Sequence, residues 1–200
     1  MAVRQLWVHE DEEGMRCLWP ASALPHIAGD LGISAETAER SADPNGWGYS
    51  EIHQISHPEA SFADHGLRRD AVMAALSPIM PRFDRIQTGD GKYYGFIDDD
   101  ALCFGFDNMC FIYGATHDGM VRVFFFNAWT DDAGQLHALR RAVEAIDALS
   151  PASLVDYWVK EAGLTSDKVF LDSYFAALMD RAEARSTLDL IRNNHRHDPP

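Results

Sequence analysis

The sequence predicts an α+β fold in which an antiparallel β-meander over about residues 92–127 packs against helices. Four β-prone runs follow one another in the middle of the chain, and the residues after 131 show helical spacing. A length of 200 residues suits a single well-buried core. We therefore expect one α+β domain over 1–200, with a mixed hairpin and helix part over 1–90, the β-meander over 91–128 and a helical C-terminal part over 131–192.

The N-terminal part combines strand and helix signals. Its two β-rich runs, VRQLWVH and MRCLWP, are separated by EDEEG, whose glycine and charges favour a turn, so a β-hairpin is expected. Asp43-Pro44-Asn45-Gly46 predicts a further turn, because proline presets one dihedral and glycine admits positive φ. The other expected elements are a helix over 21–41, a strand over 49–55 and a helix over 66–76.

The middle of the chain predicts the meander. The runs KYYGFID, ALCFGF, MCFIYGAT and GMVRVFFFNAW are rich in aromatic and β-branched residues and are divided by short polar breaks. In the last run, strand alternation places Val121, Val123 and Phe125 on one face and Phe124 and Phe126 on the other. Apolar side chains on both faces predict a sheet that is covered on both sides.

Everything after about residue 131 is expected to be helical. Asp131 or Asp132 is placed to cap a helix through HALRRAVEAIDAL, in which the apolar residues repeat every three or four positions. Ser150-Pro151 is expected to start a second helix over SLVDYWVKEAGL, and Ser166 a third. On this assignment Trp158 belongs to the core.

The charge balance excludes some partners and favours others. Asp and Glu number 31 against 17 Lys and Arg, a formal net charge of -14, and every third of the chain is acidic. Nucleic acid and an anionic membrane surface would be repelled, because both are bound through Lys and Arg. A basic protein would be attracted. The same charge is also what keeps many proteins soluble, so both interpretations stay open.

The cysteines and the N-terminus predict a cytoplasmic protein. Cys17, Cys103 and Cys110 are an odd number without zinc-knuckle spacing, and two of them lie in apolar runs, as free thiols in a reducing compartment do. The N-terminal residues contain no apolar run of the kind that a signal peptide has, and no stretch is apolar for long enough to span a membrane.

Two polar clusters are candidate binding residues. The loop NGWGYSE presents aromatic side chains beside a carboxylate, and such residues often dominate a protein interface. Aspartates at the breaks of the meander could receive cationic groups. Each cluster also has a structural interpretation, since a tryptophan can plug the edge of a core and aspartates favour solvated bends. The candidate binding residues are Trp47, Tyr49, Glu51, Asp98, Asp99, Asp100 and Asp107.

A histidine cluster offers an alternative metal site. His53, His57 and His65 occur in EIHQISHPEASFADH, and imidazoles four residues apart share one face of a helix. Zinc or another divalent metal could bind there, with Glu51 or Asp64 adding a carboxylate. In a strand the same spacing separates the rings by about 13 Å, which is too far for one ion.

Two functions from different classes follow. The first is an acidic, non-enzymatic binding protein that docks on and neutralises a basic protein partner, as an inhibitor or immunity protein of a bacterial toxin does. The sequence contains no Gly-x-Ser-x-Gly and no phosphate-binding glycine motif, so we favour this class over an enzyme and expect no cofactor. The alternative is a metal-dependent hydrolase that uses His53, His57 and His65.

Overall fold

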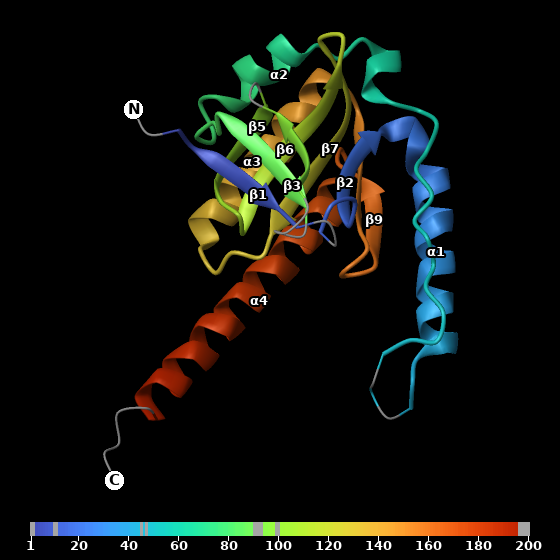
Figure 1. Ribbon diagram of the computed structural model, residues 1–200, viewed down its shortest axis with the longest axis vertical. Coiled ribbons are helices and arrows are strands. Elements are labelled where there is room, and N and C mark those ends of the chain that lie inside the picture. The colour runs from blue at the N-terminus through green and yellow to red at the C-terminus, as the bar shows by residue number, and fades with distance from the viewer. Residues whose placement is uncertain are drawn as a thin grey trace.

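The computed structural model describes residues 3–9, 12–44, 46, 48–89, 94–98 and 101–195, with side chains for all of these except 94–98 and 183–195. Its strands and helices occur mostly in separate runs along the chain and its strands pair mainly antiparallel, which defines an α+β fold (Figure 1). The strands are β1 (Gln5–Val8), β2 (Arg16–Pro20), β3 (Arg85–Gly89), β4 (Tyr94–Asp98), β5 (Leu102–Asp107), β6 (Cys110–His117), β7 (Met120–Ala128), β8 (Ala152–Asp156) and β9 (Glu161–Leu164). The α-helices are α1 (Leu24–Ser41), α2 (Arg69–Leu76), α3 (Ala133–Leu149) and α4 (Lys168–His195), and short 3₁₀-helices cover Ala21–Ala23 and Phe62–His65.

The described strands form two sheets. The larger sheet has the order β5-β6-β7-β2-β8-β9 and is antiparallel throughout. The smaller sheet has the order β1-β3-β4. The predicted meander is confirmed for β5, β6 and β7, whereas the run that precedes it, β4, belongs to the smaller sheet.

Both faces of the larger sheet are covered. Helices α2, α3 and α4 pack on one face and share a core with side chains of β5, β6, β7 and β8. On the other face, the smaller sheet covers β5 and β6, and α1 covers β2 and β8. An extended segment over residues 49–60, the strap, lies along α1 (Figure 1). The site described below lies on this second face.

The alternation in β7 has one interruption. Val123 and Phe125 face α1 and the smaller sheet, and Phe124 and Phe126 face the helices, as predicted. Val121 joins the helix side, contrary to the expectation, because the register with β6 shifts between Ala115 and Thr116. A bulge of this kind moves the residues beyond it to the opposite face.

The predicted N-terminal hairpin is wrong, although both of its strands exist. β1 pairs in parallel with β3, whose mixed RIQTG sequence gave no clear strand signal. β2 lies between β7 and β8, and all five of its residues are buried. The side chains of β2 are covered by helices on one face and by α1 on the other, so its apolar sequence belongs to the middle of a covered sheet and not to an N-terminal hairpin.

The helix expected over 150–164 is also wrong. Ser150 ends α3, and the chain continues as β8, a turn and β9. All residues of β8 are buried, and a continuous apolar run of this length is equally typical of a buried strand and of a short buried helix. As a result Trp158 lies in the β8–β9 turn and is 45% exposed, where the helical assignment placed it in the core.

The other predicted helices are confirmed. Asp132 caps α3, accepting hydrogen bonds from the N–H groups of Gly134 at 2.7 Å and Gln135 at 3.2 Å. The helices predicted over 21–41, 66–76 and from Ser166 correspond to α1, α2 and α4. The strand predicted over 49–55 is instead part of the strap, in which only Tyr49 forms a β-bridge among the described residues. No helix in the described ranges combines the length and the apolar character needed to cross a membrane.

The three cysteines are free and fully buried. Cys17 is 1% exposed, and Cys103 and Cys110 are 0% exposed. Burial raises the pKa of the Cys17 thiol above its usual range and that of Cys110 to about 12. The Cys17 and Cys110 thiols are therefore protonated, and all three cysteines act as small apolar side chains of the core.

Replacement by alanine should have opposite effects on stability at Gly105 and at Gly32. A Cβ at Gly105 would lie 2.5 Å from the Cys110 carbonyl oxygen, which is backbone and cannot move aside. Gly32, in α1, has no such neighbour within 4 Å, and alanine favours a helix by about 0.5–1 kcal/mol over glycine. We expect Gly105→Ala to lower the free energy of unfolding and Gly32→Ala to raise it, measured by urea denaturation. Equal effects of the two substitutions would contradict the close approach of β5 and β6.

Candidate binding site

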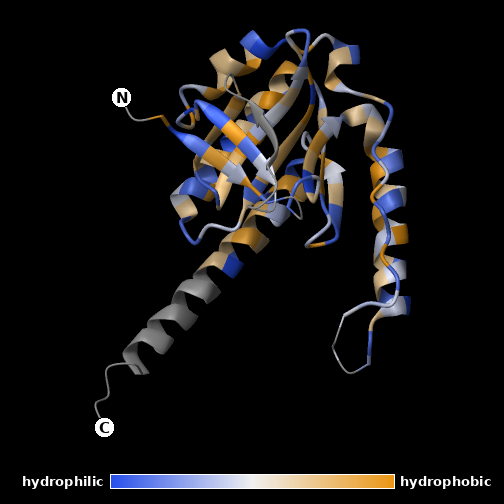
Figure 2. Cartoon of the chain, in the orientation of Figure 1, coloured by the Kyte–Doolittle hydropathy of each residue, from blue (hydrophilic) through white to orange (hydrophobic). Residues whose placement is uncertain are grey.

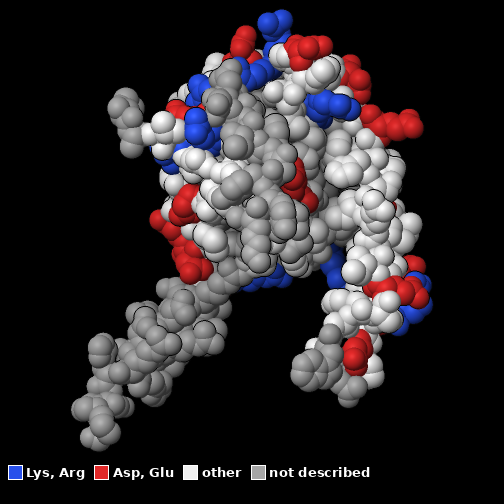
Figure 3. Space-filling view, viewed as in Figure 1, with Lys and Arg blue, Asp and Glu red and all other residues white. Residues whose placement is uncertain are grey.

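A groove lies between α1, the strap and the β8–β9 turn. Its volume is about 340 Å³, and we call it the α1 groove. Small side chains of α1, those of Ser34, Ala35 and Ala38, form one wall. In the space-filling view, the arm made by α1 and the strap stands beside the body of the molecule with a hollow between them (Figure 3). Small residues on a helix leave room for side chains from outside.

The apolar residues of the groove are unusually accessible. Tyr49 is 65% exposed and Ile52 is 91% exposed, and both come from the strap. Trp158 lines the opposite side from the β8–β9 turn. Figure 2 shows hydrophobic residues (orange) between hydrophilic ones (blue) along the strap. Large side chains gathered at a concave site, exposed in the isolated chain, mark an interaction surface more strongly than scattered ones do.

The strap is anchored to α1 through one carboxylate. Asp30 of α1 is 5% exposed, and its Oδ1 accepts hydrogen bonds from His53 Nε2 at 2.8 Å and from Ser56 N–H at 3.1 Å. Its Oδ2 accepts a hydrogen bond from the Tyr157 hydroxyl at 2.7 Å. One carboxylate thus joins three parts of the chain that surround the groove, namely α1, the strap and the β8–β9 turn.

These contacts determine how Asp30 ionises. Burial by itself raises the pKa of the carboxyl group, but the hydrogen bonds from Tyr157, His53 and Ser56 outweigh it, and the net pKa lies below the usual value. Asp30 is therefore an anion at neutral pH and can only accept hydrogen bonds, so that His53 Nε2 must be the donor. Burial of the phenol, and then the Asp30 carboxylate, raise the pKa of Tyr157 above its usual range.

Further contacts hold the strap along its length. Arg40 of α1 forms an ion pair with Glu51 at 2.7 Å, on the solvent side of the groove. The ring of His57 packs edge-on against Trp19 with the centroids 5.6 Å apart. The strap is thus held by side chains and not by a β-ladder.

The β8–β9 turn presents Trp158 through the backbone of its neighbours. Asp156 Oδ1 accepts hydrogen bonds from the N–H groups of Trp158 at 2.9 Å and Val159 at 3.3 Å, which closes an Asx turn. Lys160 has φ of 60°, a left-handed conformation that disfavours a residue with a Cβ. The Trp158 ring packs edge-on against Trp129 with the centroids 6.0 Å apart. Trp158 is therefore held in place while one side of its ring stays accessible.

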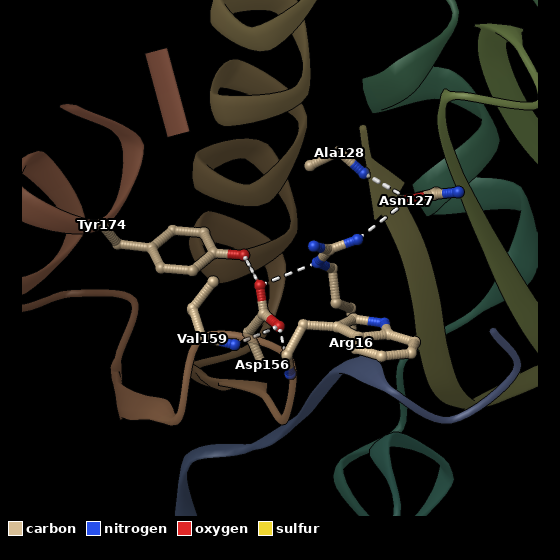
Figure 4. A network of polar contacts seen from close by, with 7 residues as sticks. Arg16, Asn127, Ala128, Asp156, Val159 and Tyr174 are labelled. Carbon is tan, nitrogen blue, oxygen red and sulfur yellow. Dashed lines mark hydrogen bonds and ion pairs between the residues drawn. The ribbon is translucent and has the colours of Figure 1, made fainter. Parts of the chain in front are cut away.

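A buried ion pair, shown in Figure 4, holds the β8–β9 turn in place. Arg16 of β2 is 2% exposed and Asp156 is 0% exposed, and Arg16 Nε donates to Asp156 Oδ2 at 2.7 Å. The Tyr174 hydroxyl of α4 donates to the same oxygen at 2.8 Å, and Arg16 Nη1 donates to Asn127 Oδ1 at 2.9 Å. The guanidinium lies 4.4 Å from the centroid of the Trp129 ring. Its Nη2 is buried without a hydrogen-bond partner in the described part of the chain.

The predicted binding residues fall into three groups. Tyr49 and Glu51 line the α1 groove. Asp107 lies elsewhere, at the end of β5, where its carboxylate accepts hydrogen bonds from the N–H groups of Met109 and Cys110. Trp47, Asp99, Asp100 and the side chain of Asp98 lie outside the described residues.

Two residues of the groove were not found from the sequence. Ile52 belongs to neither predicted cluster, and the helical assignment of SLVDYWVKEAGL places Trp158 in the core. An isolated isoleucine between Glu51 and His53, in a segment without period, was the available signal for an exposed apolar residue.

The three histidines of the alternative metal site make separate contacts. His53 binds Asp30, His57 packs on Trp19, and His65 lies at the end of a 3₁₀-helix beside Asp64. Asp64 in turn accepts hydrogen bonds from Ser61 N–H and hydroxyl. Within the described ranges, no three or more His, Cys, Asp or Glu side chains are grouped so that they could hold a metal ion.

Comparison with known proteins does not place this chain in a family. No protein-family model matches the chain, and no curated protein or solved structure is detectably similar to it.

The ion pair predicts a large effect of one substitution. Asp156→Asn leaves the Arg16 charge buried and uncompensated, so we expect the free energy of unfolding to fall by about 3 kcal/mol or more. Arg40→Gln, which removes an exposed ion pair, is the control and is expected to change it far less, because water solvates the exposed partner Glu51. Urea denaturation followed by circular dichroism measures both. Similar effects of the two variants would show that the buried pair does not hold the turn.

Asp30 predicts a pH dependence. Its pKa is lowered on folding, so its contribution to stability is complete above the unfolded pKa of about 3.9 and is lost as the pH falls through the folded-state pKa. We expect Asp30→Asn to lower the free energy of unfolding by about 1–3 kcal/mol at pH 7. The difference from the unaltered protein should shrink as the pH is lowered to about 3. A difference that stays constant over this range would contradict the role of the ionised carboxylate.

Proposed function

We propose that this protein is a non-enzymatic binding protein that docks on a basic protein partner, and that the α1 groove is the centre of its interface. The observation that carries the proposal is the concave group of accessible apolar residues, Tyr49, Ile52 and Trp158, each of which is fixed by polar contacts of its neighbours. Rigid aromatic anchors around a pocket are typical of residues that dominate a protein interface.

Charge supports a basic partner. The chain carries a formal net charge of -14, and the exposed acidic residues beside the groove include Glu36, Glu39 and Glu51. The basic residues at the groove are Lys160, which lines it, and Arg40, which is already paired with Glu51. Such a surface steers a cationic partner toward an apolar centre. A bacterial toxin with a cationic active site is an example of a partner that this docking would neutralise.

The polar side chains near the α1 groove that could act in catalysis are instead engaged in contacts that hold the strap and the β8–β9 turn. His53 is held by Asp30, and the Tyr157 hydroxyl donates to the same carboxylate. The three cysteines are buried, which removes them as nucleophiles. We infer a cytoplasmic setting for the same reason, since three free thiols suit a reducing compartment.

The proposal is tested by partner capture with matched variants. The baits are the unaltered protein, the double variant Tyr49→Ala/Trp158→Ala, and Met109→Ala as control, because Met109 is 47% exposed in another turn. We expect the unaltered protein and Met109→Ala to capture the same basic protein. For that identified partner, we expect the double variant to bind at least about tenfold more weakly.

The charge part of the proposal has its own measurement. The association rate with the captured partner should fall at least about tenfold between 50 and 500 mM NaCl, because screening shortens the range of the steering field. A partner that the double variant binds equally well would place the interface away from the α1 groove. An association rate that does not respond to salt would contradict recognition by charge.

A further inference from the structure

The two edges of the larger sheet use their backbone groups differently. β5 forms one edge, and the segment that precedes β3 runs along it. Gly105 N–H donates to the Pro81 carbonyl at 2.9 Å, and Phe83 N–H donates to the Cys103 carbonyl at 2.9 Å. The Arg4 guanidinium donates to the Gly105 carbonyl. This edge is thus covered by the chain itself, which is how proteins prevent unwanted strand pairing.

β9 forms the other edge and lies on the side of the sheet nearest α1 (Figure 1). Thr165 N–H donates to the Ala152 carbonyl of β8 at 3.0 Å. Strand alternation therefore directs the N–H groups of Ala162 and Leu164 away from β8. The Leu164 carbonyl accepts from Asp167 N–H at 3.1 Å and closes the far end of the edge. Within the described ranges, the N–H and carbonyl of Ala162 and the N–H of Leu164 have no backbone partner.

Two grooves reach the beginning of this edge, while Ala162 packs against the core that lies under α1. Lys160, at the start of the edge, lines the α1 groove on one face. The next residue, Glu161, lines a second groove of about 370 Å³ against α4, which we call the α4 groove. Val169 and Phe170 contribute apolar side chains to it, and Val169 is 80% exposed. A strand added beside β9 would direct alternate side chains toward the two grooves.

We propose that an extended segment of the basic partner adds to the larger sheet by pairing with β9 at Ala162 and Leu164. This inference rests on the proposed function and states how the partner binds. In such β-augmentation the main chain supplies affinity, and pockets for alternate side chains supply specificity. The α1 and α4 grooves are those pockets, and the exposed carboxylate of Glu161, which lines the α4 groove, receives a Lys or Arg side chain of the segment.

Charge argues against a second copy of this chain as the occupant. Each copy carries a formal net charge of -14, so two copies repel each other over their whole surface. Pairing of two β9 strands would also bring Glu161 of both copies to the same short edge. A basic segment reverses both effects.

The test uses a defined probe, the fluorescein-labelled peptide KKVLVLVKK with blocked termini. A matched peptide, N-methylated at its three central residues, keeps the side chains and charges but loses its central strand donors. The protein variants are Ala162→Pro, which removes the outward N–H and spares the bonds to β8, and Ala162→Ser, which keeps it. Binding is measured by fluorescence anisotropy, and folding of each variant by circular dichroism.

We expect the unaltered protein and Ala162→Ser to bind the peptide equally. Ala162→Pro, and separately N-methylation of the peptide, should each weaken binding about tenfold, the effect of losing one or two backbone hydrogen bonds. If Ala162→Pro does not fold, comparing how the two peptides bind to the unaltered protein shows whether strand pairing takes place.

The failures of the two proposals are distinguishable. Peptide binding that ignores both N-methylation and Ala162→Pro, but is weakened by Tyr49→Ala/Trp158→Ala, would overturn strand pairing and leave the α1 groove as the interface. No peptide binding at millimolar concentration would also overturn strand pairing. The proposed function is then judged by the captured partner alone.

Discussion

The buried ion pair between Arg16 and Asp156 connects the elements on which the candidate site depends. Removing two charges from water is unfavourable, and the structure offsets this with hydrogen bonds from Tyr174 and to Asn127 and with the ring of Trp129. The pair thereby links β2, β7, α4 and the β8–β9 turn at one point. Because Asp156 also closes the Asx turn that carries Trp158, the site inherits its geometry from the core.

The α1 groove lies where two segments held by polar side chains face each other. One is the β8–β9 turn, and the other is the strap, which side chains hold against α1 through Asp30. The Tyr157 hydroxyl contacts the same carboxylate and so joins the two. Polar contacts occupy the buried side of both segments, which leaves their apolar residues facing outward. This division is expected of a surface that binds a partner, and unexpected in a core segment.

Local patterns predicted those elements whose signals are local. The β5-β6-β7 meander, α2 and the Asp132 cap of α3 follow from alternation, spacing and capping chemistry within a few residues. The pairing of β1 with β3 and the insertion of β2 between β7 and β8 depend on contacts between distant segments, which periodicity does not encode. Trp158 was misplaced for the same reason, because SLVDYWV fits a helix stripe and a buried strand equally well. Tyr49 and Glu51, which line the α1 groove, were predicted as binding residues because an aromatic in a glycine-rich loop is itself a local signal.

The three buried cysteines give this chain a built-in reporter of its own opening. Cys17 lies under α1, Cys103 under the smaller sheet and Cys110 under α3, so each thiol is covered by a different layer. A thiol reagent reaches each of them only when the layer above it has separated from the sheet. The order in which the three sulfurs are alkylated in the folded protein would therefore rank the local stabilities of these layers, without any engineered label.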